Sequence, residues 1–230
     1  MQRVKSGIPG FDILTDGGFV PGTVNLISGV AGSGKTIFSA QFAYFGARFA
    51  DEQSAVISIE SPKEDYIQAI SPFGMDPSNT ERLWLIDLGE IGGEGEQYID
   101  FQVLQKFLSD FIAKQNIRRL VIDSLTGVGL QYRNAEEFRE HLFKFTRFLK
   151  KRKITTILTT ESIENGPYTR FGVEQFVCDS FIVLGLEEIK GTLRRTILIR
   201  KMRFTKHDTA KHPFIIGTRG VEIGASEKVI

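Results

Sequence analysis

The sequence predicts an α/β fold in which helices flank a mostly parallel central sheet and antiparallel hairpins follow at the C-terminal end. Two observations lead to this prediction. Up to about residue 172, short β-rich runs alternate with longer helical patterns, an order typical of βαβ units. Beyond that point the β-rich runs follow one another closely, with short turns and no helix between them, which indicates antiparallel pairing.

Eight runs rich in aliphatic and β-branched residues are the expected strands. The parallel ones are 24–29 (VNLISG), 55–60 (AVISIE), 83–88 (LWLIDL), 119–124 (RLVIDS) and 155–160 (TTILTT). Those expected to pair antiparallel are 176–186 (FVCDSFIVLGL), 192–202 (TLRRTILIRKM) and 213–223 (PFIIGTRGVEI).

Three helices are expected between the parallel strands, from Thr36 to about Phe49, from Phe101 to about Gln115, and over 135–151. The third has the clearest pattern, because its apolar residues recur at i, i+4, i+7 and i+11 and so share one face. It opens with acidic residues and ends in the cationic run 147–153 (RFLKKRK). Since that order complements a helix dipole, we interpret the run as a helix end rather than a nucleic-acid patch.

Composition indicates a single domain spanning residues 1–230. Hydrophobic residues make up 41% of the chain, enough for a sizeable core. There is no linker, internal repeat or low-complexity segment, and the Gly-rich acidic stretch 89–97 (GEIGGEGEQ) is expected to be a loop.

Charge and residue usage favour a cytoplasmic protein. The formal net charge of +1 argues against a protein held to DNA or membranes by bulk charge. The single cysteine, Cys178, excludes an internal disulfide and suits a reducing compartment. The first residues contain charges and no apolar leader, and no apolar run is long enough to span a membrane.

The strongest motif is GVAGSGKT over 29–36, which matches the G-x-x-x-x-G-K-[ST] phosphate-binding loop, or P-loop. It follows an expected strand and opens an expected helix. Backbone N–H groups there point at phosphates, and the helix dipole favours negative charge. The candidate nucleotide-binding residues are Gly29, Val30, Ala31, Gly32, Ser33, Gly34, Lys35, Thr36 and Ile37.

Three side chains are candidates for the chemistry on a bound nucleotide. Lys35 would reach the β- and γ-phosphates, and the Thr36 hydroxyl would ligate Mg²⁺. Asp123 ends an apolar strand, as the second metal-binding acid of a P-loop protein does, and would hold Mg²⁺ through water.

Glu60 is the candidate general base that orients and deprotonates water. It ends the strand after the P-loop helix, at the edge of the sheet where ligands gather in such folds. The alternative is that Glu60 is a solvated acid beginning the following helix.

The stretch 199–208 (IRKMRFTKHD) concentrates cations near the C-terminal end. On a strand, Lys201 and Arg203 share a face, with Met202 and Phe204 expected to pack on the other. These cations could meet a phosphate, or they could form a solvated edge that discourages aggregation. The local sequence leaves both open.

Several long segments resemble the KaiC-like branch of the RecA-type ATPases, and the resemblance runs nearly end to end. They are 3–18 (RVKSGIPGFDILTDGG), 71–76 (SPFGMD), 121–128 (VIDSLTGV), 159–180 (TTESIENGPYTRFGVEQFVCDS) and 201–216 (KMRFTKHDTAKHPFII). The chain is most similar to the first, ATP-hydrolysing domain of KaiC. The resemblance implies a RecA-type fold, ATPase activity, and ATP and Mg²⁺ as ligands.

The resemblance also implies a role for the cations at 199–208. In this family a K-x-R pair reaches ATP bound at the neighbouring subunit of a ring, usually a hexamer. The matching residues here are Lys201 and Arg203, with His207 nearby. A cation so placed stabilises charge on the γ-phosphate, as an arginine finger does.

The sequence departs from the family pattern at two places. Relatives often carry paired acids where this chain has Glu60 followed by Ser61, which leaves the rate of hydrolysis open. The Ser and Thr that KaiC's second domain phosphorylates are replaced by Gln175 and Phe176, so autokinase activity is not expected.

Two other functions stay open. A RecA/RadA-type recombinase paralogue would bind DNA through loops 127–134 and 163–175, which contain only Arg133 and Arg170 as cations. A nucleotide-sensing subunit would bind ATP, oligomerise and barely hydrolyse it. The expected partners are further copies of the chain and a protein that the sequence does not identify, with nucleic acid disfavoured.

Overall fold

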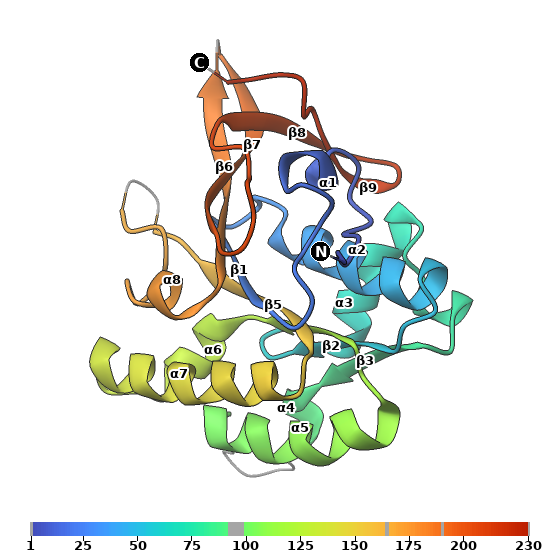
Figure 1. Cartoon of the computed structure of the whole chain (residues 1–230), viewed down its shortest axis with the longest axis vertical. Coiled ribbons are helices and arrows are strands. Elements are labelled where there is room, and N and C mark those ends of the chain that lie inside the picture. Colours follow the sequence, from blue (N-terminus) through green and yellow to red (C-terminus); the bar gives the residue numbers. More distant parts are fainter. Residues whose placement is uncertain (1, 92–98, 164–165, 190, 230) are drawn as a thin grey trace.

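The computed structural model describes residues 2–91, 99–163, 166–189 and 191–229. Its centre is one sheet of nine strands in the order β3-β2-β4-β5-β1-β6-β7-β8-β9. Figure 1 shows helices packed around the parallel part, with the C-terminal strands rising above it.

The strands are β1 Val24–Gly29, β2 Ser54–Ser58, β3 Leu83–Asp87, β4 Arg119–Asp123, β5 Thr155–Glu161, β6 Ser180–Ile189, β7 Thr192–Met202, β8 Lys211–Gly217 and β9 Gly220–Ile223. The α-helices are α1 Phe11–Leu14, α2 Lys35–Phe49, α3 Lys63–Ile70, α4 Leu88–Ile91, α5 Phe101–Gln115, α6 Leu125–Gly129, α7 Ala135–Lys151 and α8 Glu174–Val177. Two 3₁₀ turns, Ser71–Phe73 and Pro77–Asn79, follow α3.

The parallel strands β1 to β6 form the core of the sheet, and β1 to β5 are the five strands predicted to be parallel. All residues of β1 and β2 are buried, because helices cover both faces of this part of the sheet. The register aligns the carboxyl ends of the central strands: Gly29 of β1 pairs with Glu161 of β5, and Ser58 of β2 pairs with Asp123 of β4. Loops that leave these ends therefore meet at one edge, which we call the P-loop edge.

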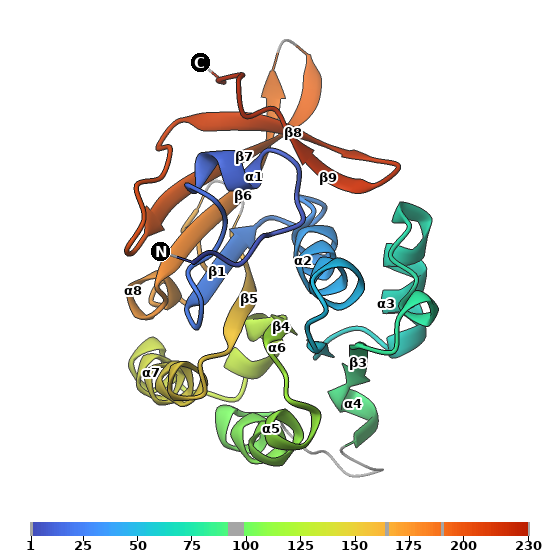
Figure 2. The same cartoon turned by 45° about the vertical axis from the view of Figure 1, so that its right-hand side comes forward.

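Two hydrophobic clusters hold the helices to the sheet. α1, α2 and α3 pack on one face, and α5, α6 and α7 pack on the other (Figures 1 and 2). α5 and α7 have the bounds predicted from their patterns, and each begins at a side-chain cap. Asp100 accepts from two backbone N–H groups of α5, and Asn134 accepts from the N–H of Glu137 at the start of α7.

β7, β8 and β9 extend the sheet antiparallel, as predicted, with one strand more than expected. The prediction for 176–186 is wrong in part: its first residues end helix α8, and β6 begins at Ser180 and pairs parallel with β1, although it pairs antiparallel with β7. The run 213–223 does not form a single strand. It folds into β8 and β9, which pair with each other around a turn at Thr218 and Arg219. Gly220 has a φ of 93°, a left-handed conformation that glycine adopts without strain.

The expected loop at 89–97 is only partly described. Its first residues complete the short helix α4, so the loop prediction is wrong there, and 92–97 lie outside the described residues. Within the described part of the chain, no helix combines the length and apolar character needed to cross a membrane.

Candidate nucleotide-binding site

The P-loop joins β1 to α2, as the motif requires. Gly29 packs so tightly that an added Cβ would lie 2.4 Å from Ser33 Oγ and 2.5 Å from the Leu184 carbonyl oxygen, so no larger residue fits. Gly34 caps α2 with a φ of 100°, which favours glycine. The Ser33 hydroxyl is buried and finds no hydrogen-bond partner in the described residues. The loop therefore turns tightly onto the N-terminus of α2.

Lys35 bends back over the loop. Its ammonium donates to the carbonyl oxygens of Gly29 at 2.9 Å and Val30 at 3.1 Å. Burial lowers the pKa of Lys35, and the charges of Asp123, Glu161 and Glu60 oppose that shift. One cation thus stands among three carboxylates, which leaves an acidic site suited to a divalent cation.

Thr36 and Asp123, the two predicted metal-binding residues, are in contact. The Thr36 hydroxyl donates to Asp123 Oδ2 at 2.9 Å, and the Thr159 hydroxyl donates to Oδ1 at 2.5 Å. Asp123 is the last residue of β4, so the strand itself aims the carboxylate at the P-loop edge. Hydroxyl and carboxylate oxygens side by side are the donors that Mg²⁺ prefers.

Glu60 lies at the same edge, two residues beyond the end of β2, so the strand is shorter than predicted. Although the residue is solvent-exposed, its carboxyl group lies near Ser124 and Gly127. Partial desolvation raises the pKa of Glu60, and the charges of Glu161 and Asp123 raise it further, against the hydrogen bond from Ser124. A carboxylate with a raised pKa is better matched to general-base work.

Glu161 belongs to this cluster and was missed by sequence reasoning. It is the last residue of β5, opposite Gly29 of β1. The signal was present, because an acid directly after the run 155–160 occupies the same edge as Asp123 does in the neighbouring strand. Without the strand order, however, that acid cannot be distinguished from the start of a solvated loop.

Arg195 is a second residue missed from the sequence. This side chain of β7 donates through Nε and Nη2 to the Gly32 carbonyl oxygen, both at 3.2 Å. The antiparallel extension therefore touches the tip of the P-loop. Nothing local marked Arg195, since it stands among other cations and threonines in the run 192–202.

Lys201 and Arg203 lie away from the P-loop edge of their own chain. Lys201 pairs with Phe181 near the start of β6, whereas the P-loop begins beside Leu184, about 10 Å further along that strand. Lys201 Nζ donates to the carbonyl oxygens of Gln175 at 3.0 Å and Cys178 at 2.6 Å. Burial and the adjacent charge of Arg203 lower the pKa of Lys201.

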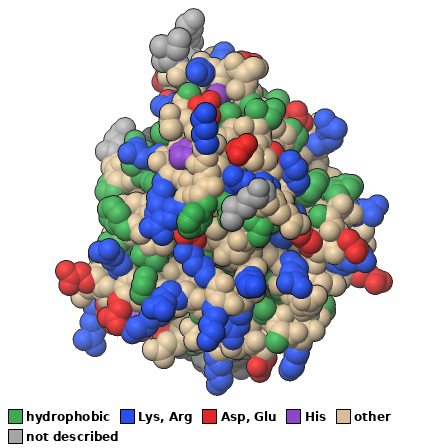
Figure 3. Space-filling view, in the orientation of Figure 1, with side chains coloured by type: hydrophobic (Ala, Val, Ile, Leu, Met, Phe, Trp, Pro, Cys, Tyr) green, Lys and Arg blue, Asp and Glu red, His purple; other side chains and the backbone are tan. Residues whose placement is uncertain are grey.

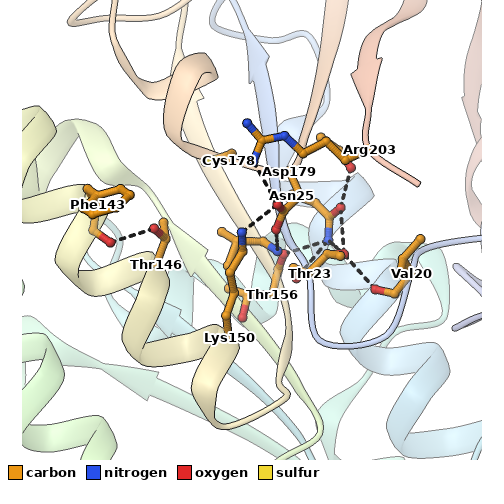
Figure 4. A network of polar contacts seen from close by, with 12 residues as sticks. Val20, Thr23, Asn25, Phe143, Thr146, Lys150, Thr156, Cys178, Asp179 and Arg203 are labelled. Carbon is orange, nitrogen blue, oxygen red and sulfur yellow. Dashed lines mark hydrogen bonds and ion pairs between the residues drawn. The ribbon is translucent and has the colours of Figure 1, made fainter. Parts of the chain in front are cut away.

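Arg203 pairs with Asp179 at 3.4 Å, and Lys150 of α7 contacts the same carboxylate oxygen at 2.6 Å (Figure 4). Asp179 is buried and also accepts from the N–H of Val24. Arg203 itself remains exposed, beside a surface groove of about 610 Å³ that Lys201 also lines. We call this the far-end cation site, since it stands at the amino-terminal end of β1 and β6.

The expected packing around the K-x-R pair is only half right. Met202 is buried, but β7 ends there, and Phe204 has a φ of 62° and is 70% exposed. The chain turns after β7, so strand alternation no longer applies to Phe204. His207 lies half-buried in the same turn, with its Nδ1 3.4 Å from the Thr205 carbonyl oxygen.

The cationic run 147–153 also has structural partners. Besides the Lys150–Asp179 pair, Arg152 donates to Ser109 at 2.9 Å and its guanidinium lies 3.8 Å from the centre of the Phe148 ring. Figure 3 shows Lys and Arg side chains spread over the lower part of this face, where α5 and α7 lie. These contacts fit the interpretation of the run as a helix end.

A P-loop between β1 and α2, an aspartate ending β4 and antiparallel strands beyond β6 define a RecA-type P-loop ATPase fold. Comparison with known families then specifies the branch: the model of the KaiC ATPase family matches residues 4–228. The chain belongs to the KaiC ATPase family.

Individual relatives agree with this family assignment. The circadian clock oscillator protein KaiC of Synechococcus elongatus is 35% identical over 97% of this chain, and that of a Nostoc species is 36% identical over 97%. This chain spans only 44% of the length of either relative. A solved KaiC-like protein of the archaeon Pyrococcus horikoshii OT3 is 36% identical, with a TM-score of 0.83 over 96% of this chain and 98% of that one.

Proposed function

We propose that this chain is a single-domain, cytoplasmic ATPase that binds Mg²⁺-ATP at the P-loop edge and assembles into a homo-oligomeric ring, with a hexamer expected. The observation that carries the ring is the separation of the two sites. The far-end cation site lies at the opposite end of β1 from the P-loop, so Lys201 and Arg203 are suited to a nucleotide held by another copy.

The P-loop edge fits Mg²⁺ by the chemistry of its donors. Thr36 and Asp123 supply a hydroxyl and a carboxylate already in contact, and the surrounding acids outnumber Lys35. Thr36 would ligate the ion directly and Asp123 through water. When bound, Mg²⁺ neutralises charge on the β- and γ-phosphate oxygens.

The residues of the site have separate roles in hydrolysis. The P-loop N–H groups and Lys35 bind and orient the phosphates, with Ser33 offering an additional buried hydroxyl donor. Glu60 accepts the proton of the attacking water, and its raised pKa supports that role. Arg203 of the neighbouring copy stabilises charge developing on the γ-phosphate, with Lys201 and His207 beside it.

Absolute mass in solution is the first test. Light scattering with Mg²⁺-ATP should give a species of about six times the 25.8 kDa chain mass, and a smaller species without nucleotide. A monomer under both conditions would remove the neighbour that Arg203 requires and would contradict the ring.

Mixing two inactive variants tests action in trans directly. Lys35→Ala loses its own phosphate site but keeps Arg203, and Arg203→Ala keeps the phosphate site. In random mixed rings, about a quarter of the interfaces join an intact phosphate site to an intact Arg203, so hydrolysis should reappear on mixing. No recovery in rings shown to be mixed would contradict the assignment.

The same assays separate the two alternatives. A nucleotide-sensing subunit would bind ATP tightly in a full ring and release negligible phosphate. Such slow hydrolysis would fit the single acid, Glu60, at the place where relatives often carry two. A recombinase paralogue would bind single-stranded DNA at low salt and hydrolyse ATP faster in its presence. We expect phosphate release that DNA leaves unchanged. The nucleotide cycle would control either ring assembly or affinity for a partner protein. Measuring both with ATP and with ADP shows which of the two changes.

A further inference from the structure

Tyr66 on α3 carries a buried hydroxyl without a partner. The residue is 2% exposed and packs in the cluster that holds α2 and α3 to the sheet. Its Oη makes no hydrogen bond within the described part of the chain. Burying a hydroxyl without a partner is unfavourable, because its hydrogen bonds to water are lost. A phenylalanine would fill the same space without that cost, so the hydroxyl calls for a role.

The hydroxyl lies beside the candidate metal-binding residues. Burial raises the pKa of Tyr66, the nearby Asp123 carboxylate raises it further, and the Ser39 hydroxyl opposes that shift. Ser39 is one helical turn after Lys35 and Thr36 and donates to the Lys35 carbonyl oxygen at 2.7 Å. α3 thus brings Tyr66 to the place where the start of α2 meets the end of β4.

Asp123 can accept a third donor. Its two oxygens accept from Thr36 and Thr159, and an ionised carboxylate offers about four lone-pair positions. Hydrogen bonds to an ionised acceptor are shorter and stronger than those to a neutral one. Of the two polar groups near Tyr66, Asp123 is therefore the favoured acceptor over Ser39.

We propose that Tyr66 is a positioning residue whose hydroxyl donates to the Asp123 carboxylate and fixes its orientation toward Mg²⁺ in the nucleotide-bound protein. This inference rests on the proposed function, since it concerns the same metal. α3 begins three residues after Glu60, so the contact also ties the segment carrying the candidate base to the metal-binding carboxylate. Outer partners of this kind change metal affinity by about 10- to 100-fold.

Tyr66→Phe tests the proposal without requiring turnover. The amount of bound fluorescent ATP analogue is measured while free Mg²⁺ is titrated. The Mg²⁺ concentration at half-saturation should rise about tenfold in the variant. Nucleotide binding in the presence of a chelator should match wild type, and the melting temperature without nucleotide should be equal or higher, because no buried hydroxyl is left unpaired.

The matched control is Tyr44→Phe, a buried tyrosine of the same cluster that packs on Phe49. It should keep the wild-type Mg²⁺ midpoint. A wild-type midpoint in Tyr66→Phe would overturn the proposal, and so would the full midpoint shift in Ser39→Ala, which would assign the partner to Ser39. Wild-type protein without any Mg²⁺-dependent binding would instead refute the proposed function.

Discussion

The P-loop edge and the far-end cation site handle charge in opposite ways. At the P-loop edge, Lys35 stands among three carboxylates, and one of them, Asp123, accepts from the hydroxyls of Thr36 on α2 and Thr159 on β5. At the far end, Lys201 and Arg203 outnumber the single buried carboxylate of Asp179, and backbone carbonyls hold the lysine. One end suits a divalent cation, the other an anion. In the proposed ring, each Mg²⁺-ATP would meet the P-loop edge of one copy and the far-end cation site of the next.

Arg203→Ala is expected to have the largest effect on hydrolysis. It removes a cation of the far-end cation site and leaves the P-loop edge unchanged. Hydrolysis per ring should fall about 10³-fold, the lower bound of arginine-finger effects, while nucleotide binding is retained. Phosphate release and equilibrium binding are measured on the same preparation. Lys206→Ala removes an exposed cation three residues away and serves as the control. Equal turnover by Arg203→Ala would eliminate any catalytic use of the far end.

Glu60→Gln acts at the other end. Loss of a general base should lower the rate of hydrolysis about 10²-fold and leave ring assembly with Mg²⁺-ATP intact. Glu64→Gln, an exposed acid at the start of α3, is the matched control and should keep the wild-type rate. If Glu60→Gln also keeps the wild-type rate, Glu60 is a solvated acid, as the alternative interpretation holds.

The pH profile gives a smaller but more specific signal. The pKa of Glu60 is raised above its ordinary value of 4.5, and a base works only when deprotonated. Hydrolysis should therefore fall as pH decreases through that raised pKa, starting at a higher pH than an ordinary glutamate would give. The rate is measured against pH at saturating Mg²⁺-ATP. The residual activity of Glu60→Gln should lack this acid limb, and its persistence would place the titration elsewhere.

A substitution remote from both sites shows how much a loss of stability alone changes the rate of hydrolysis. Asn134→Ala removes the cap of α7, whose Oδ1 accepts from the Glu137 N–H at 2.9 Å. The free energy of unfolding should fall by about 1 kcal/mol, measured by denaturant titration, with the rate per folded ring unchanged. A large loss of turnover in this variant would mean that the effects at either end partly report stability.

The sequence was sufficient for the parts of the fold that depend on local pattern. The P-loop, the bounds of α5 and α7 and the aspartate ending β4 all follow from spacing and alternation within a few residues. Glu161 and Tyr66 could not be assigned in the same way. Their significance comes from which strands and helices are neighbours in space, and a glutamate after a strand or a tyrosine in a helix has many unremarkable uses.

The errors have a similar cause. Phe204 was expected to pack opposite Arg203 because strand alternation was extended past Met202, where β7 stops. The pattern of 213–223 predicts one strand because its turn residues, Thr218 and Arg219, lack the Asn-Gly or Asp-Gly pair that marks a tight hairpin. In both places the end of an element was decided by tertiary pairing rather than by local composition.

The strand β7 links the P-loop edge to the far-end cation site within one copy of the chain. Arg195 near its beginning touches the P-loop tip of its own chain, and Lys201 near its end belongs to the far-end cation site, about 20 Å away along one hydrogen-bonded strand. β7 pairs with β6 along its length and also with β8 over Arg195–Leu198, and a paired strand resists bending more than a loop does. In the proposed ring, one strand of each copy would therefore contact its own P-loop through Arg195 and offer Lys201 to the nucleotide of the next copy.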